Sequence, residues 1–338
     1  MRYFIIVIGL CLCMFFGFLL WPSTTQTLPY DDEQQALDEQ ITIKISHVVA
    51  QNTPKGLAAQ HFANLVEQKS NGHIDVQVFA NAVLYNDETE LAALQHNDVQ
   101  MIMPTVSKMT TEVPAWAVLD IPYLFHDAQH VERFFTSEEA QQLLAMSSVD
   151  NVIPRAFWAN GFKHFLSELP ITKIDDFQQQ YVRIMDSHIL KEQFTLLDAT
   201  PITLAFQDIF SNAKAQTYTI QENTFSNIAS KNIDGFQPYV TVSAHGLLSY
   251  VVLINEDFYT QLPPDVQQII DEALHETTAW HFAQSAQLNK QAYATLQQRA
   301  EISTLSDIEK RRFQQRMAPI YEAYANTHYK QIIDTFAQ

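Results

Sequence analysis

The sequence predicts an α/β protein of two lobes that enclose a cleft and are braced by one long helix. Two separate series of alternating strand-like and helix-like segments support the two lobes, because this alternation is typical of largely parallel sheets. The length of 338 residues also exceeds the roughly 100 to 150 residues of one ordinary domain. A late apolar stripe without Gly or Pro is long enough to cross both lobes.

The first 40 residues predict export and a polar linker. Residues 3–21 contain no charge and precede a polar stretch, as in a secretion signal. These 19 residues are also close to the roughly 20 that span a bilayer, so a cleaved signal peptide (1–21) and a retained anchor both remain open. Residues 22–40 carry five acids without an apolar face and predict a solvated linker. Cys11 and Cys13 lie in the signal, so no disulfide is expected in the exported part.

The first series of elements predicts one α/β lobe. Residues 41–49 alternate in polarity like a strand, and Thr53-Pro54 opens a helix that ends at Asn71-Gly72. A strand, a helix, a strand and an apolar element are expected at 73–79, 86–96, 99–103 and 118–124. In such sheets, ligands bind beyond the carboxyl ends of the strands.

The second series predicts another lobe and the long helix. The series runs through 152–158, 181–185, 191–197 and 217–221, with a helix-like segment directly after the strand at 181–185, and two more strand-like runs lie at 239–243 and 250–254. Pro263, Pro264 and Asp265 then signal a helix start, and the apolar stripe continues toward Arg299. A helix of about 35 residues is about 50 Å long, which predicts that it braces both lobes. Ser306 and Glu309 form a capping box for a later helix.

The charge of the chain limits its partners. Its net charge is −18, and without Arg2 the exported part has 19 Lys and Arg against 38 Asp and Glu, or −19. Nucleic acid and anionic membrane surfaces are therefore not expected as partners. A site for an anion must be a local cluster of cations, and only seven Lys or Arg lie between residues 134 and 250.

Arg183 is the most informative of these cations. It lies in the apolar strand Tyr181-Val182-Arg183-Ile184-Met185, where an inward guanidinium is stable only if oxygen atoms face it. A fixed acid of the same protein and a bound anionic ligand can both supply them. The strand pattern alone leaves these two alternatives open.

Three other residues can reach the same crevice as Arg183. Lys163 follows the strand that ends near Trp158, Phe206 follows a short apolar run, and Asn223 ends another strand. Lys163 could add a charge, Asn223 a hydrogen bond, and Phe206 an apolar cover for a small organic acid. Singly, they are also typical of a solvated loop charge, a helix N-cap and a core residue.

Motifs for metal, nucleotide or covalent chemistry are weak. His126 and His130 have the i, i+4 spacing of a zinc helix, but the segment provides no third ligand or general base. The glycines after the signal are isolated, so no phosphate loop forms. No serine lies in a Gly-x-Ser-x-Gly motif. We therefore expect no metal, no cofactor and no catalytic residue.

From about residue 41 to 330, the chain resembles the substrate-binding proteins of tripartite ATP-independent periplasmic (TRAP) transporters, of the C4-dicarboxylate-binding type. The resemblance is carried by the segments SHVVAQNTPKG, DIPYLFHDAQH, FWANGFK, YVRIMDS, ATPITLAFQDIF, QENT and VSAHGLLSYVVLINEDF. It implies the bilobed periplasmic-binding-protein fold, with two hinge strands and a long helix spanning both lobes. Lobe I would comprise 41–160 and about 249–288, and lobe II 161–248 and about 289–338.

The resemblance also assigns site residues. It implies that Arg183 forms the principal salt bridge to a substrate carboxylate, with Lys163 as a second cation. Phe206, Asn223 and His245 stand where the family has an aromatic residue, an amide and a histidine near the ligand. Lys163 replaces a common Arg and would hold a carboxylate less rigidly.

Asp186 is an acidic residue close to a site that is expected to bind an anion. Asp186 lies close to Arg183 in the sequence. It could neutralise part of that cation or select a ligand with a hydroxyl or amine. The usual substrate of the family is therefore an open question for this chain.

These observations predict a periplasmic, exported receptor that captures a small organic acid by hinge closure and performs no chemistry. It would deliver the ligand to the small and large integral membrane subunits of a TRAP transporter, and we expect a monomer. Residues 3–21 would tether it to the inner membrane if they are retained. A receptor for a signalling system and, remotely, a periplasmic enzyme on the same frame are the alternatives. The sequence does not identify the acid.

Overall fold

A mixed sheet of nine strands organises the part of the chain that the computed structural model describes, residues 40–325. The predicted signal (1–21), both cysteines and residues 22–39 of the linker lie outside it. The strands are β1 (Ile41–Ser46), β2 (Ile74–Phe79), β3 (Met101–Ile102), β4 (Val152–Ser167), β5 (Tyr181–Ile184), β6 (Thr200–Thr203), β7 (Ile220–Asn223), β8 (Tyr239–Asn255) and β9 (Glu301–Thr304). Their order is β2-β1-β3-β8-β4-β7-β5-β6, and β9 pairs with β8.

Helices cover both parts of this sheet. The α-helices before β5 are α3 (Pro54–Lys69), α4 (Glu90–Gln95), α5 (Val106–Met109), α6 (Ala128–Phe135) and α7 (Glu138–Leu144). Those after β5 are α8 (His188–Thr195), α9 (Ile209–Lys214), α10 (Phe225–Lys231), α11 (Glu256–Gln261), α12 (Pro264–Leu296), α13 (Asp307–Arg316) and α14 (Ala318–Ala325). The 3₁₀ helices are η1 (Pro114–Asp120), η2 (Ile174–Phe177), η3 (Phe206–Asp208) and η4 (Ile233–Gly235).

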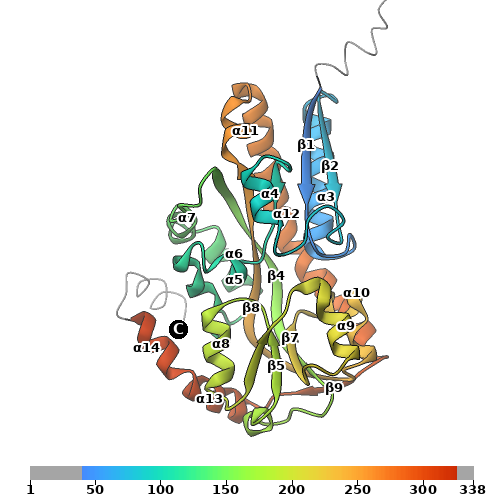
Figure 1. Ribbon diagram of the computed structural model, residues 1–338, viewed down its shortest axis with the longest axis vertical. Helices are drawn as coiled ribbons and strands as arrows, with labels where there is room; N and C mark the ends of the chain where they lie inside the picture. The colour runs from blue at the N-terminus through green and yellow to red at the C-terminus, as the bar shows by residue number, and fades with distance from the viewer. Residues whose placement is uncertain (1–39, 326–338) are drawn as a thin grey trace, which may run out of the picture. The chain divides into compact units, whose positions relative to one another are not determined.

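The sheet has two parallel parts joined by two long strands. In one part β1 runs parallel to β2 and β3, and in the other β5 runs parallel to β6 and β7. Between them β8 and β4 are antiparallel neighbours of 17 and 16 residues that pass through both parts (Figure 1). We call the part with β1 to β3 lobe I and the part with β5, β6, β7 and β9 lobe II. The bilobed α/β fold with two hinge strands is thus confirmed, while the exact residue boundaries of the lobes remain a prediction.

The long helix is the brace that the sequence predicts. Helix α12 has 33 residues and packs against α3 of lobe I and α10 of lobe II (Figure 1). Pro264 occupies its first turn, where the missing N–H has no partner to lose. Buried apolar side chains on β4 and β8 belong to one large core that extends into both lobes, and a smaller core lies around α9 and α10.

A helix follows the strand of Arg183, as the sequence predicts. Residues 191–197 fall mostly in helix α8, which begins after Ser187, whose hydroxyl accepts the N–H of Leu190. The buried side chains Ile189, Leu190, Gln193 and Phe194 recur at helical spacing, so they cover the sheet instead of extending it. The next strand, β6, then pairs with β5.

Two other predictions are refined. The runs 239–243 and 250–254 are one continuous strand, β8, and the apolar element at 118–124 lies mostly beyond the end of the 3₁₀ helix η1. Helix α3 begins as predicted, with Thr53 accepting the N–H of Gly56 at 3.3 Å.

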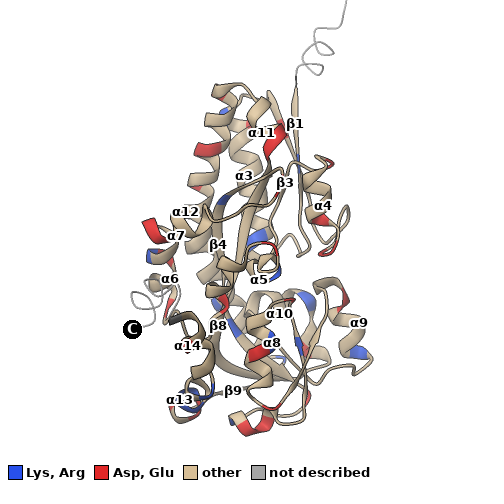
Figure 2. Cartoon of the chain, turned by 60° about the vertical axis from the view of Figure 1, so that its left-hand side comes forward, with Lys and Arg blue, Asp and Glu red and all other residues tan. Residues whose placement is uncertain are grey.

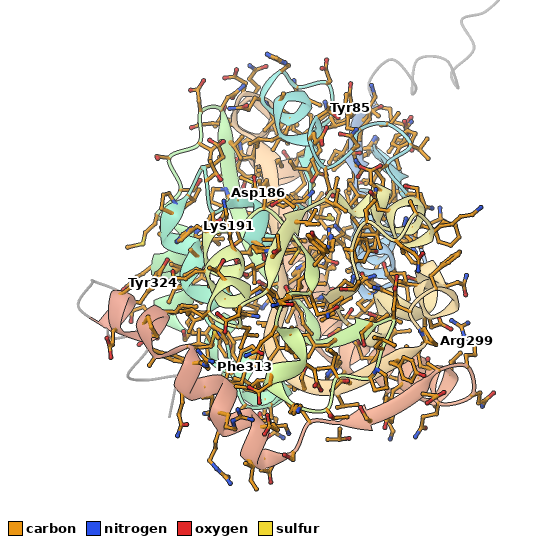
Figure 3. The ribbon with its side chains drawn as sticks, turned by 60° about the horizontal axis from the view of Figure 1, so that its bottom comes forward. Tyr85, Asp186, Lys191, Arg299, Phe313 and Tyr324 are labelled. Atoms are coloured by element: carbon orange, nitrogen blue, oxygen red, sulfur yellow. The ribbon has the colours of Figure 1, made fainter. Side chains whose placement is uncertain are left out.

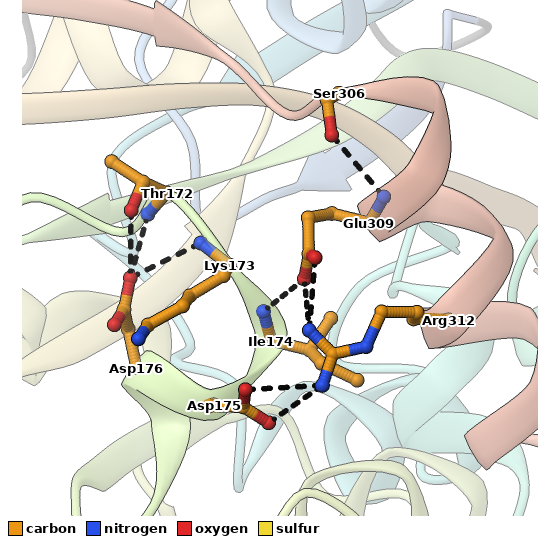
Figure 4. A network of polar contacts seen from close by, with 8 residues as sticks. All are labelled: Thr172, Lys173, Ile174, Asp175, Asp176, Ser306, Glu309 and Arg312. Atoms are coloured by element: carbon orange, nitrogen blue, oxygen red, sulfur yellow. Dashed lines mark hydrogen bonds and ion pairs between the residues drawn. The ribbon is translucent and has the colours of Figure 1, made fainter.

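A polar network fastens helix α13 to lobe II. Arg312 donates to both carboxylate oxygens of Asp175 at 3.0 Å and to Glu309 at 2.9 and 3.0 Å (Figure 4). Glu309 also accepts the backbone N–H of Ile174 at 2.9 Å, and its own N–H donates to Ser306 at 3.2 Å. The predicted capping box region therefore also positions α13 on η2.

Candidate functional site

A small polar cavity of about 20 Å³ lies between the lobes and brings together four of the six predicted site residues. Lobe I contributes Val48, Val49, Asp87, Thr105 and Lys108, and lobe II and the two hinge strands contribute the rest of the lining. The predicted residues that line it are Lys163, Arg183, Phe206 and Asn223. His245 and Asp186 are not among its lining residues.

Arg183 is buried at the carboxyl half of β5, with 2% of its surface exposed. Its Nε and one terminal nitrogen donate to the carbonyl oxygen of Leu204 at 3.0 and 2.5 Å. Burial lowers the pKa of Arg183 to about 10, while Tyr218 and Glu222 act in the opposite sense. Within residues 40–325, no Asp or Glu forms an ion pair with Arg183. A carbonyl carries no net charge, so the guanidinium keeps its charge for an anion in the cavity.

Lys163 has an internal partner that the sequence reading does not foresee. Its Nζ donates to Glu222 Oε1 at 2.6 Å, and Glu222 Oε2 is 2.7 Å from His245 Nε2. Burial alone would raise the pKa of Glu222, but Lys163 and His245 outweigh it and lower that pKa to about 2. Lys163 therefore lines the cavity as half of a buried ion pair, and its charge is already balanced.

His245 acts behind this pair and does not line the cavity. Its Nδ1 is 2.7 Å from the hydroxyl of Ser243, and its ring stacks on Phe165 at 3.9 Å. Burial lowers the pKa of His245, with Glu222 opposing the shift. The imidazole thus holds the Glu222 carboxylate, which in turn holds Lys163.

Gly246, the last residue of the SAHG segment, leaves room for the side chain of Lys163. It pairs with Lys163 in the β4–β8 ladder. A Cβ atom at Gly246 would lie 2.7 Å from Cε of Lys163, closer than carbon atoms approach. The absence of a side chain at Gly246 gives the lysine stem its path to Glu222.

Phe206 and Asn223 occupy the wall formed by lobe II. Phe206 lies at the start of η3 and is largely buried, with Lys231 4.8 Å above its ring. Asn223 ends β7, and its Oδ1 accepts from the backbone N–H of Thr224 and from Nδ2 of Asn227, both at 3.0 Å. The N-cap of α10 is Thr224, so the alternative reading of Asn223 as that cap is wrong.

Asp186 lies at the exposed turn where β5 passes into α8 (Figure 3). Its charge raises the pKa of Lys108, against the stronger lowering by burial. It influences the cavity only at a distance, through a lysine of lobe I.

Lobe I contains two cations near the cavity, Lys55 and Lys108, that the sequence analysis did not single out. Lys55 is fully buried in the first turn of α3, where its Nζ donates to Met103 O at 2.8 Å and lies 4.0 Å above the ring of Tyr250. Burial lowers the pKa of Lys55 to about 8, and Glu90 opposes this shift. The sequence contained a signal for Lys55, because a lysine in the first turn of a helix interacts unfavourably with the helix dipole. A cation at such a position points to another role.

Lys108 is the second missed cation and lines the cavity directly from α5. Its Nζ forms an ion pair with Asp87 Oδ1. Burial lowers the pKa of Lys108, and Arg183 and Lys55 act in the same sense. The pKa of Lys108 falls to about 6, and the Asp87 carboxylate beside its Nζ is the group placed to stabilise the charged ammonium.

Basic residues meet where the lobes face each other, although the chain is strongly acidic. Figure 2 shows basic segments of the ribbon near α5 and α10, while acidic segments dominate outer helices such as α4 and α7. Charges that converge in a low-dielectric cavity act more strongly than the same charges in water. These cations attract a carboxylate locally, against the overall repulsive field of the acidic chain.

A larger cavity of about 500 Å³ lies elsewhere, among α6, β4, α10 and α12. Its lining is mainly apolar and includes none of the six predicted site residues. A carboxylate requires cations and hydrogen-bond donors, so we assign the ligand to the smaller polar cavity.

Residues 40–325 contain neither a metal-binding cluster nor a membrane-spanning helix. In that range no group of three or more His, Cys, Asp or Glu side chains could hold a metal ion. His126 and His130 stack on each other, and the His126 N–H donates to the His130 ring at 3.3 Å. Among the described helices, none combines the length and apolar character of a membrane span.

Comparison with known proteins gives consistent matches over nearly the whole chain. The sequence profile of the bacterial extracellular solute-binding proteins, family 7, matches residues 45–327. The C4-dicarboxylate-binding protein DctB of Bacillus subtilis is 38% identical over 332 residues, which cover 97% of this chain and 95% of DctB. The C4-dicarboxylate-binding periplasmic protein DctP of Shewanella loihica is 35% identical, with 86% and 88% covered.

Solved structures are equally similar. A TRAP periplasmic solute-binding protein of Shewanella oneidensis with bound succinate has a TM-score of 0.85 and 34% identity, covering 88% of this chain and 98% of that chain. A protein of the same kind from Pseudomonas aeruginosa with bound L-malate has a TM-score of 0.81 and 31% identity, covering 84% and 100%.

Proposed function

This chain belongs to family 7 of the bacterial extracellular solute-binding proteins, and from that premise we propose that it is an extracytoplasmic receptor for a small organic acid. The ligand is a C4-dicarboxylate, the class that the names of its relatives DctB and DctP give for those proteins. The receptor delivers this acid to a TRAP transporter with one small and one large integral membrane subunit. It is exported, acts as a monomer and works by binding alone.

One observation carries the proposal. The guanidinium of Arg183 is buried between the lobes and bonded to the neutral carbonyl of Leu204 instead of to an acid. A carboxylate that accepts two parallel N–H bonds from an arginine gains both charge and geometric match. Lys163 and Asn223 then offer additional donors from the same cavity, and Phe206 covers the carbon skeleton.

Closure of the lobes is the mechanism that this arrangement supports. The cavity is lined from lobe I and lobe II, while β4, β8 and α12 continue through both lobes. A ligand that contacts both walls has more contacts in the closed form than in the open form, and this difference favours closure. We also propose that the chain passes between the lobes at about residues 160, 248 and 288.

The proposal is tested with the purified protein and a panel of acids. Mass spectrometry identifies what co-purifies, and thermal shift with succinate, L-malate, D-glucuronate and acetate ranks the ligands. A C4-dicarboxylate at 100 times its Kd should stabilise the native state by about 2.7 kcal/mol, and acetate should have no effect. No shift with any dicarboxylate, together with no co-purifying acid, would contradict the proposed ligand class.

A further inference from the structure

One carboxylate, that of Asp87, bridges the two lobes beside the cavity. It belongs to the loop between β2 and α4 of lobe I, and its side chain is only 3% exposed. Oδ1 forms the ion pair with Lys108 of the same lobe, and Oδ2 accepts the backbone N–H of Phe206 in lobe II at 2.7 Å. Because its two partners belong to different lobes, separation of the lobes would break the bond to Phe206.

The Phe206 N–H is connected to the cation that would bind the ligand. Arg183 holds Leu204 through two hydrogen bonds to its carbonyl, and Leu204 is two residues before Phe206. An anion that fixes Arg183 thereby also fixes the short segment that presents the N–H to Asp87. The contacts run without interruption from Arg183 in lobe II to Lys108 in lobe I.

A buried acid beside a proposed anion site is unfavourable unless other groups stabilise it. Asp87 repels a carboxylate ligand at short range, and its burial is unfavourable unless a cation and a hydrogen-bond donor compensate it. Lys108 and Phe206 supply both, from different lobes. The loop does not need the Asp87 side chain for its own shape, because Asn86 Oδ1 accepts the N–H groups of Glu88 and Thr89 at 3.0 and 3.1 Å.

We propose that Asp87 is a positioning residue that latches the lobes shut: it locks Lys108 on one wall of the cavity and captures the Phe206 N–H of the other wall when the ligand orders Arg183. This inference rests on the proposed receptor function but concerns a contact within the protein. Val48 and Val49 of lobe I belong to the same apolar cluster as Phe206, so the latch closes over a surface that excludes water.

The test uses the full chain with Asp87→Ala, Asp87→Asn and the control Glu88→Gln, which removes a charge from the neighbouring exposed position. Succinate affinity is measured by titration calorimetry. The distance between the lobes is measured by electron spin resonance between thiol-directed labels on Gln60→Cys and Lys214→Cys. Cys11 and Cys13 are replaced by Ser, so that only these two positions are labelled. Gln60 lies on α3 and Lys214 on α9, and both are exposed.

We expect Asp87→Ala to weaken succinate binding about tenfold or more and to shift the lobes toward longer distances, even without succinate. Asp87→Asn keeps an acceptor for the Phe206 N–H, so its affinity and its lobe distance should lie between those of Asp87→Ala and the native protein. Glu88→Gln should match the native protein in both measurements. Native affinity and native distances in Asp87→Ala would overturn the latch, and so would tighter binding, because Asp87 would then oppose the ligand. If the native protein binds no dicarboxylate but Asp87→Ala still opens the lobes, the ligand proposal fails and the latch stands.

Discussion

Replacing Arg183 by Ala removes the cation on which the proposed site depends. The side chain has two sets of contacts to lose: the hydrogen bonds to Leu204 O and those to the ligand carboxylate. Lys163 cannot take over, because Glu222 Oε1 already holds its Nζ at 2.6 Å. The ligand carboxylate would thus face a cavity without an unbalanced cation from lobe II.

The expected loss follows from the burial of this pair. Truncation of one partner of a buried, hydrogen-bonded charge pair weakens binding by about 2 to 5 kcal/mol. This corresponds to an affinity about 30-fold to several thousand-fold lower. Arg183→Lys should fall between Ala and native, since an ammonium cannot donate the same planar pair of bonds. Isothermal titration with succinate at fixed ionic strength measures all three.

One control variant and a measurement of unfolding separate binding from folding in this experiment. Arg316→Ala removes the same charge from an arginine that is half-exposed and 3.8 Å from Asp198, so it should bind like the native protein. Arg183→Ala also leaves the Leu204 carbonyl without its donors, which should lower the free energy of unfolding by about 1 to 3 kcal/mol. A folded Arg183→Ala protein with native affinity would refute the assignment of Arg183 as the ligand anchor.

Three further predictions concern the Lys163 pair. Glu222→Gln leaves Lys163 buried without its counter-charge and should reduce the free energy of unfolding in urea by about 3 to 5 kcal/mol, an effect that the exposed Glu88→Gln should not reproduce. The folded-state pKa of Glu222, about 2, lies below its ordinary value of 4.5, so its stabilisation is present above pH 4.5 and is lost as the pH falls toward 2. The difference in stability between native and Glu222→Gln should accordingly shrink between pH 7 and pH 3, and a constant difference would contradict this coupling. Gly246→Ala places a methyl group against the stem of Lys163 and should lower the free energy of unfolding by about 1 to 3 kcal/mol. The control Gly235→Ala should be nearly neutral, because a Cβ atom there meets no atom within 4 Å. Equal effects of the two substitutions would exclude a specific clash at Gly246.

Much of the fold could be predicted because local patterns agree with the tertiary arrangement. The stripe after Pro264 gave the length of α12, since a helix that contacts both lobes must stay apolar along one side over all of its turns. The helix after the strand of Arg183 could be expected as well, because the buried positions of α8 recur at helical spacing. Ser187, a residue type that favours helix starts, caps α8.

The site was only partly predictable. Arg183 could be found because a charge in an apolar strand contradicts its surroundings, and this contradiction is visible without coordinates. Glu222 stood in the QENT segment but could not be paired with Lys163, because the partner lies 59 positions away on another strand. Lys108 and Asp87 are polar residues in segments where solvent exposure is the ordinary expectation. Their burial arises only where two lobes meet.

The sequence by itself determined the family of the fold, the long helix and the presence of an isolated cation in an apolar strand. These follow from periodicity and composition, which act over neighbouring residues. The tertiary structure alone decided which charges cancel: Glu222 balances Lys163, Asp87 balances Lys108, and Arg183 keeps its charge. Coulomb energies depend on distance and local dielectric, and chain folding fixes both only when β4, β5, β7 and the loop of Asp87 come together.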